Sequence, residues 1–162
     1  MTNKPESSML SKLDNKVPPP IVVVFLGLGM WVLAQLTPTF TIAPHLRLFG
    51  VGIFIFLGLS IAGLGIIAFR RAKTTINPVQ PEAASTVVTQ GIFSYTRNPM
   101  YLGFTCLLIG WMLYLENLWA IFGVVAFILF TTRFQIIPEE NILSAKFGLE
   151  YGEYLKKVRR WL

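Results

Sequence analysis

The feature that most restricts the fold of this chain is an apolar run at residues 48–69, which contains no charged side chain. A helix of about 20 such residues can cross the hydrocarbon core of a bilayer. The whole chain has this character, because 54% of its 162 residues are hydrophobic and 14% are charged, against roughly 25% charged in soluble domains. One soluble core of this size could not bury so much apolar surface. We therefore expect a single all-α integral membrane domain over residues 1–162.

Four segments are predicted to be transmembrane helices, at residues 18–36, 48–69, 99–115 and 118–137. The second and fourth have the length that a crossing helix needs, and the first and third are shorter. Prolines near the start of these two shorter segments suit the first turn of a helix. The first segment has one alternative, a signal peptide cut after residue 43, which Pro44 disfavours. Residues 116–117 leave room only for a tight hairpin between the last two spans.

Basic residues predict the orientation of these spans. With four crossings, every Lys and Arg except Arg47 lies on the side that holds both termini and the loop 70–98. Because positively charged loops face the cytoplasm, both termini and the active site are expected on the cytoplasmic side. The net charge of +6 then indicates contact with membrane lipids and their anionic headgroups, and no nucleic-acid partner is expected.

The two ends of the chain have different patterns. Residues 1–16 are polar, and we expect a flexible segment there. Residues 138–162 carry apolar side chains at steps of three and four, which predicts an amphipathic cytoplasmic tail. Gly148 is expected to divide this tail into two short helices. Such a tail either lies on the membrane surface or also covers a site, and the sequence leaves both arrangements open.

Small residues gather near the end of the second predicted span. Residues 63–68 match the pattern G-x-G-x-x-A, which indicates dinucleotide binding only between a strand and a helix, and here it lies within an apolar span. Gly58, Ala62 and Gly65 favour close packing of another helix. Glycines near the cytoplasmic end also let a ligand approach the backbone, so packing and ligand binding both stay open for Gly63 and Gly65.

The segment Arg97-Asn98-Pro99 carries the densest local signal. Pro99 suits the first turn of the third span, and Asn98 is expected to cap that helix. A helix N-terminus with free N–H groups and a nearby arginine can bind a carboxylate. The alternative is an ordinary helix start, at which Arg97 extends to the membrane surface.

A second polar segment follows the fourth span. Pro138 is expected to bend the chain there. Glu139 and Glu140 either interact with the dipole of the next helix or hold ribose hydroxyls or an ammonium group. Arg133 lies one turn inside the span, where a charge is costly unless it is paired. It is therefore a candidate for contact with an anionic group of a substrate.

Several classes of site are excluded by the residues that the chain lacks. His45 is the only histidine and falls on the outer side, and Cys106 is the only cysteine. No Ser-His or Cys-His nucleophile pair can form on the cytoplasmic side, and no metal site is expected.

Residues 85–103, 138–143 and 147–154 together resemble the family of isoprenylcysteine carboxyl methyltransferases and phospholipid N-methyltransferases. The resemblance extends over about residues 60–160. It implies an integral-membrane methyltransferase that uses S-adenosylmethionine and releases S-adenosylhomocysteine. It also implies that the cofactor binds on the cytoplasmic side, and that a lipid-like acceptor enters from the bilayer.

The resemblance, carried over by position, also implies the site residues. The catalytic candidates are Arg133, Glu139 and Glu140. Gln135 stands where the isoprenylcysteine enzymes have an arginine, and either Arg133 or Gln135 would then contact the acceptor. The implied cofactor contacts are Gly63, Gly65, Ser85, Thr86, Val87, Val88, Phe93, Arg97, Asn98, Pro99, Met100, Tyr101, Glu139 and Glu140.

Methyl transfer fits these residues, because it needs alignment and exclusion of water but no metal and no protein nucleophile. A carboxylate or thiol acceptor is favoured over an amine, since an amine needs a base to take its proton. Two other functions stay open: an NADPH-dependent membrane reductase acting on a sterol or isoprenoid, and a non-enzymatic membrane assembly protein.

Overall fold

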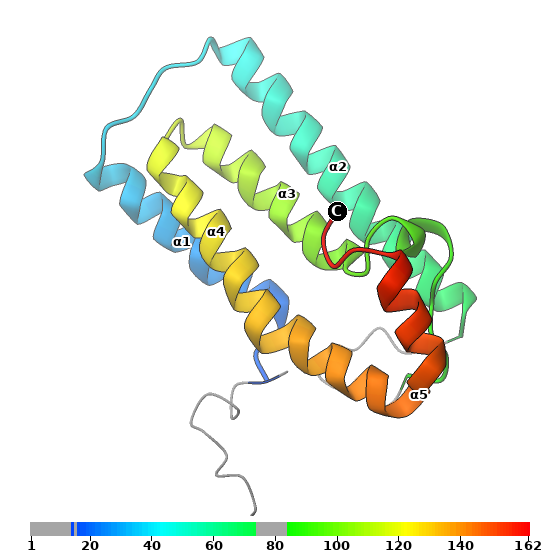
Figure 1. Ribbon diagram of the computed structural model, residues 1–162. Coiled ribbons are helices and arrows are strands. Elements are labelled where there is room, and N and C mark those ends of the chain that lie inside the picture. The colour runs from blue at the N-terminus through cyan, green and yellow to red at the C-terminus, as the bar shows by residue number, and fades with distance from the viewer. Residues whose placement is uncertain (1–13, 15, 74–83) are drawn as a thin grey trace, which may run out of the picture.

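The computed structural model describes residue 14 and residues 16–73 and 84–162. Within these ranges all regular structure is helical, which confirms the predicted all-α class (Figure 1). The main helices are α1 (Pro19–Leu36), α2 (Pro44–Arg71), α3 (Pro99–Tyr114), α4 (Ile121–Thr131) and α5 (Ile137–Lys157). Two short 3-10 helices, Gly91–Ser94 and Leu118–Ala120, precede α3 and α4. Most of the predicted flexible segment 1–16 lies outside the described residues.

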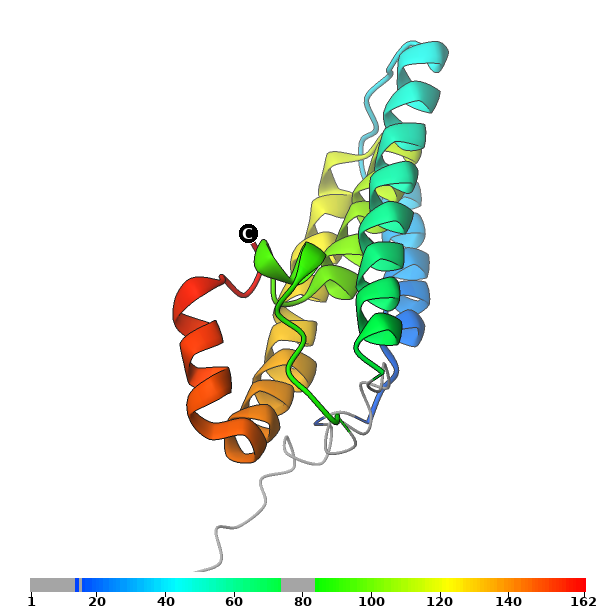
Figure 2. The ribbon, with the colours of Figure 1, turned by 90° about the vertical axis from the view of Figure 1, so that its right-hand side faces the viewer.

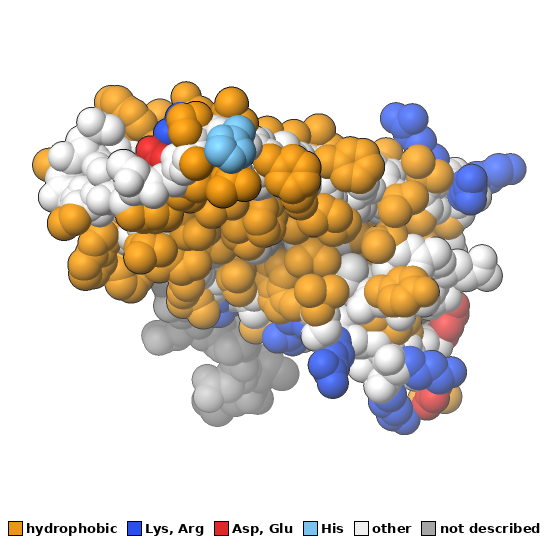
Figure 3. Space-filling model, turned by 90° about the horizontal axis from the view of Figure 1, so that it is seen from above, with side chains coloured by type: hydrophobic (Ala, Val, Ile, Leu, Met, Phe, Trp, Pro, Cys, Tyr) orange, Lys and Arg blue, Asp and Glu red, His pale blue; other side chains and the backbone are white. Residues whose placement is uncertain are grey.

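Three helices are long and apolar enough to cross a membrane: α1, α2, and the helix that runs through α4 into α5. The fourth, α3, is apolar but has 16 residues, just below the roughly 17 that a crossing helix needs. Large side chains on these helices point outward, among them Phe25 at 75% exposure and Phe56 at 71%. Seen from the end that carries the α1–α2 loop, hydrophobic side chains cover most of the molecule (Figure 3). Such a surface is suited to lipid, and the protein is an integral membrane protein.

Helix α2 starts four residues earlier than the apolar run that predicted it. Pro44 takes the first turn, where the missing N–H of proline costs nothing. The helix ends at Arg71, with Arg70 and Arg71 in its last turn. Basic side chains at this end favour the helix dipole, so the polar residues that flank the apolar run extend the helix at both ends.

Helix α2 lies along α3, and two glycines face each other across their contact. A Cβ placed on Gly103 would lie 2.6 Å from the carbonyl oxygen of Gly58, and one placed on Gly58 would lie 2.8 Å from that of Gly103. Gly65 packs against Pro99, whereas nothing lies within 4 Å of a Cβ on Gly63. The structure therefore confirms packing by small residues for Gly58 and Gly65.

We expect the substitution Gly103→Val to disrupt this α2–α3 contact, since neither backbone can move away without breaking its own helix. The cost of overpacking is about 2 kcal/mol or more, which would lower the melting temperature by roughly 4–8 °C. Thermal unfolding of the purified protein in detergent measures the effect. Gly52→Val is the matched control, because a Cβ at Gly52 meets nothing within 4 Å. Equal melting temperatures for the two variants would contradict the glycine contact.

A π turn, Thr132–Ile136, joins α4 to α5, and the chain stays helical through Pro138. The helix therefore continues through Pro138, and the π turn lies directly before the proline, which cannot complete a regular helical ladder. A bend at Pro138 stays a prediction. The break occurs at Gly148, where φ is 52° and ψ is −120°. This positive φ suits glycine and confirms the predicted division of the tail.

After Gly148 the second half of α5 turns back beside the loop that precedes α3 (Figure 2). The tail therefore covers a pocket, which agrees with one of the two arrangements that the sequence left open. The loop and the returning helix together close one side of the bundle end, and a pocket lies between them.

Candidate functional site

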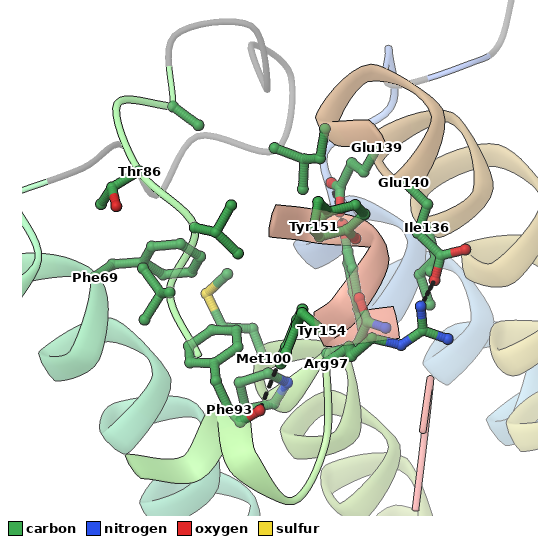
Figure 4. Close-up of a pocket in the computed structure, with 17 residues that line it drawn as sticks. Phe69, Thr86, Phe93, Arg97, Met100, Ile136, Glu139, Glu140, Tyr151 and Tyr154 are labelled. Atoms are coloured by element: carbon green, nitrogen blue, oxygen red, sulfur yellow. Dashed lines mark hydrogen bonds and ion pairs between the residues drawn. The ribbon is translucent and has the colours of Figure 1, made fainter. Parts of the chain in front are cut away.

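The pocket lies where the ends of α2 and α3 meet α5 (Figure 4). Its cavity volume is about 110 Å³, below the range of about 300–1,000 Å³ that is usual for small-molecule sites. The loop before α3 and the returning half of α5 form its other walls. The lining residues are Phe69, Ala84, Thr86, Val87, Val88, Phe93, Arg97, Asn98, Pro99, Met100, Tyr101, Ile136, Glu139, Glu140, Leu143, Tyr151 and Tyr154.

Most of the residues implied as cofactor contacts line this one pocket, although they come from two distant parts of the chain, residues 86–101 and 139–140. Those that line it are Thr86, Val87, Val88, Phe93, Arg97, Asn98, Pro99, Met100, Tyr101, Glu139 and Glu140. Their role in cofactor binding stays a prediction, but the fold brings them together around one space.

The other three implied contacts do not line the pocket. Ser85 is exposed, and its hydroxyl donates to the carbonyl of Lys73 at 3.3 Å. Gly63 and Gly65 lie further along α2, and Gly65 faces Pro99. Close helix packing accounts for Gly65 without any ligand.

Arg133 also lies outside the pocket lining. Its side chain is 46% exposed and pairs with Asp14, with Nη1 3.3 Å from Oδ1. Its guanidinium carbon lies 5.2 Å from the centroid of the Phe134 ring. An exposed ion pair and a ring contact stabilise the charge at the end of α4, so the structure does not bring Arg133 to the other candidate residues.

Gln135 has the opposite environment. Its side chain is fully buried in the π turn, where Nε2 donates to the carbonyl of Val17 at 2.8 Å. Its Oε1 has no hydrogen-bond partner among the described residues. The amide therefore attaches the π turn to the start of α1, and it does not line the pocket.

The polar end of the pocket is built around Glu140. Arg97 Nη1 lies 3.1 Å from Glu140 Oε1, and Arg160 donates from Nε to Oε1 at 3.1 Å and from Nη2 to Oε2 at 2.7 Å. The Arg97 and Glu140 side chains are only 13% and 14% exposed. Two guanidinium groups on one carboxylate leave a positive charge at this end.

Arg97 has one donor left over. Its Nε is buried and has no hydrogen-bond partner among the residues that the structure describes. An unsatisfied buried donor is costly, and a guanidinium prefers to bind an anion such as a carboxylate. The arrangement is therefore suited to an anionic group of a ligand.

Glu139 has a different environment from its neighbour. The hydroxyl of Tyr101 donates to Glu139 Oε1 at 2.8 Å. Burial raises the pKa of Glu139 to about 7; the charge of Glu140 acts in the same direction and the Tyr101 hydrogen bond opposes it. Glu139 can therefore hold or release a proton near neutral pH, whereas two arginines bind Glu140 as a carboxylate.

The other wall of the pocket is apolar and aromatic. The rings of Phe69 and Phe93 meet edge to face, with centroids 5.0 Å apart. Tyr154 donates from its hydroxyl to the carbonyl of Phe93 at 2.8 Å, which fixes the returning half of α5 against this wall. Aromatic faces and aliphatic side chains of this kind can hold a flat heterocycle.

The last residues of the chain attach to the segment before α3. The main-chain N–H of Arg97 donates to the carbonyl of Arg159 at 3.1 Å, and Asn98 Nδ2 donates to the carbonyl of Arg160 at 2.9 Å. The prediction that Asn98 caps α3 is therefore wrong for its side chain, which makes no capping bond. The carbonyl of Arg160 is its partner instead.

Sequence reasoning missed Arg160. Basic residues at the end of a membrane protein are usually read as lipid contacts, and nothing in the residue order distinguishes Arg160 from Arg159. The signal that could have found it is the apolar stripe that ends at Trp161, because such a stripe indicates a covered face.

Comparison with known proteins identifies the family. The sequence model described as phospholipid methyltransferase matches residues 46–150. A probable protein-S-isoprenylcysteine O-methyltransferase of Oryza sativa subsp. indica is 31% identical over 113 residues, 68% of this chain and 58% of the rice protein. The Schizosaccharomyces pombe protein-S-isoprenylcysteine O-methyltransferase is 38% identical over 74 residues, 44% of this chain and 30% of that enzyme.

A Haemophilus influenzae protein that carries no functional name is 51% identical over 63 residues, 39% of this chain and all of that protein. The chain spans roughly half the length, or less, of the named methyltransferases that it matches. No solved structure matches it significantly. The matched region contains nearly all of α2, all of α3 and α4 and most of the pocket, and the chain belongs to the phospholipid methyltransferase family.

Proposed function

We propose that this protein is a methyltransferase that uses S-adenosylmethionine to methylate a lipid-like or small amphiphilic acceptor at the cytoplasmic face of a membrane. The observation that carries the proposal is the buried pocket in which Arg97 Nε has no partner among the described residues. Family membership and relatives named as O-methyltransferases support it.

The pocket residues fit S-adenosylmethionine. Arg97 would hold its carboxylate, together with N–H groups in the first turn of α3, which have no partner within the helix. Glu139 and Glu140 would hold its ammonium or ribose hydroxyls, and the wall at Phe93 would hold its adenine. When bound, the cofactor supplies a methyl group on a positively charged sulfur.

The protein's own part in the reaction is alignment, exclusion of water and control of one proton. The returning half of α5 covers the pocket, and the apolar wall keeps water from the reacting groups. Glu139, with its pKa of about 7, is placed to accept a proton when the acceptor carries one. Glu140 is engaged by two arginines and serves instead to hold polar groups in place.

For the acceptor we propose a carboxylate or a thiol in preference to an amine. The similar enzymes from rice and fission yeast are named for O-methylation of isoprenylcysteine, and a carboxylate acceptor needs no base. Arg133 remains the candidate contact for an anionic group of the acceptor. Because it pairs with Asp14, this role requires the exposed ion pair to open when the acceptor binds.

We further propose four membrane spans, with α3 as the short one and both termini in the cytoplasm. The supporting observation is the order of α1 to α4, which lie side by side and alternate in direction (Figure 1). Fusions of a cytoplasmic reporter to either end should both be active, because an even number of crossings returns the chain to its starting side. Reporters active at one end only would contradict the four-span arrangement.

Calorimetry on the purified protein tests the function. The wild-type protein should bind S-adenosylhomocysteine and should not bind NADPH. It should also transfer labelled methyl groups from S-adenosylmethionine to a prenylcysteine or a membrane lipid extract. Binding of NADPH alone would indicate the reductase, and binding of neither ligand would indicate an assembly protein.

A further inference from the structure

The C-terminal strap, residues 158–162, contacts the segment before α3 through its main chain. Three consecutive residues of that segment donate to it: Thr96 Oγ1 and Asn98 Nδ2 to the carbonyl of Arg160, and the Arg97 N–H to the carbonyl of Arg159. Trp161 Nε1 also donates to Thr132 Oγ1 in the π turn, at 3.2 Å. None of these four contacts uses the Arg160 side chain.

The Arg160 side chain has a separate role, because it makes most of the hydrogen bonds that the Glu140 carboxylate accepts. Arg160 makes two bonds, one to each carboxylate oxygen, and Arg97 reaches only Oε1 through Nη1. A carboxylate without that competitor would form the bidentate pair that arginine and carboxylate prefer, and Nε of Arg97 is one of the donors that such a pair uses. The free Nε of Arg97 thus depends on Arg160.

We propose that Arg160 is a positioning residue of the cofactor site: by holding Glu140 it keeps Arg97 Nε free for the carboxylate of the cofactor. This inference rests on the proposed function. Arg160 does not line the pocket, so it acts through Glu140 and does not contact the ligand. The C-terminal strap is then part of the binding site as well as a cover for it.

The test compares Arg160→Ala with Arg159→Ala by calorimetric titration with S-adenosylhomocysteine at constant ionic strength. The two variants lose the same charge from adjacent residues, but the Arg159 side chain is exposed. Arg160→Ala should weaken binding about ten-fold or more, the loss expected for a charge-assisted bond, and Arg159→Ala less than about two-fold. Equal affinities would overturn the inference.

Two further variants separate positioning from stability. Arg160→Lys keeps the charge but cannot form a bidentate pair with a carboxylate. The affinity of this variant for S-adenosylhomocysteine should therefore lie between those of the wild type and Arg160→Ala, with a near wild-type melting temperature. If Arg160→Ala does not fold, Arg160→Lys decides: wild-type affinity overturns the inference. In a Glu140→Gln background, Arg160→Ala should change the affinity for S-adenosylhomocysteine little further, because the carboxylate that Arg160 binds is absent.

Failure of the inference about Arg160 can be distinguished from failure of the proposed function. A lower melting temperature with unchanged affinity would show that Arg160 only stabilises the fold, which overturns the inference. A full second loss of affinity in the Glu140→Gln background would also overturn it. Failure of the wild-type protein to bind S-adenosylhomocysteine would instead overturn the proposed function.

Discussion

The double variant Glu139→Ala/Glu140→Ala is expected to bind S-adenosylhomocysteine at least about a hundred-fold more weakly than the wild type. Among the residues that the structure describes, these are the only acidic side chains that line the pocket, and both can accept from the ammonium and ribose hydroxyls of the ligand. Two charge-assisted bonds of about 1.5–3 kcal/mol each give a loss of this size. Calorimetry measures it, and the melting temperature shows whether the fold is intact.

The matched control is Glu150→Ala/Glu153→Ala, which removes two exposed carboxylates from the same helix outside the pocket. It should change affinity by less than about two-fold. A folded Glu139/Glu140 double variant with wild-type affinity would remove both carboxylates from the proposed site.

Single substitutions should show that the two glutamates differ. Glu139→Gln keeps an acceptor for the Tyr101 hydroxyl and resembles the protonated form that a pKa of about 7 makes abundant at neutral pH. Glu140→Gln instead removes the shared counter-charge of two guanidinium groups. Glu140→Gln should therefore lower the melting temperature more than Glu139→Gln does.

Arg97→Ala is expected to weaken binding of S-adenosylhomocysteine about ten- to hundred-fold, because it removes a charge-assisted bond of about 1.5–3 kcal/mol to the ligand carboxylate. Arg97→Lys should recover only part of this loss. A single ammonium group cannot hold Glu140 and also present a second donor at the position of Nε.

A second ligand makes this test specific. 5′-Methylthioadenosine lacks the amino-acid part of S-adenosylhomocysteine, so Arg97→Ala should leave its affinity nearly unchanged. Arg70→Ala serves as the control variant, since Arg70 is an exposed arginine at the end of α2 outside the pocket lining. Equal losses for both ligands would mean that Arg97 shapes the pocket without contacting the carboxylate.

The residue order alone predicted the helical elements with small errors in their bounds. Long apolar runs can satisfy their backbone in lipid only as helices, which is why the spans at α1, α2 and α4 follow from composition. Pro99 in the first turn of α3 and the positive φ of Gly148 are also local effects, set by one residue and its immediate neighbours. The sequence could therefore indicate where each helix begins and where the tail divides.

Local patterns were less informative where a helix could continue or stop. Pro138 does not end the helix, because the π turn before it lets the helix run on to Gly148. Residues 63–68 left packing and ligand binding open, and only the α2–α3 contact showed that Gly65 meets Pro99. In both cases the outcome depends on neighbours that are distant in the sequence.

The pairing of side chains across the site was decided by the tertiary structure. Glu139 and Glu140 are adjacent and chemically alike in the sequence, yet one bonds Tyr101 and the other holds Arg97 and Arg160. The sequence determined the helices and the candidate residues, because helix formation depends on local hydrophobicity and backbone preference. Which arginine joins the site and which faces solvent depends on the turn at Gly148, which brings residue 160 back against residue 98.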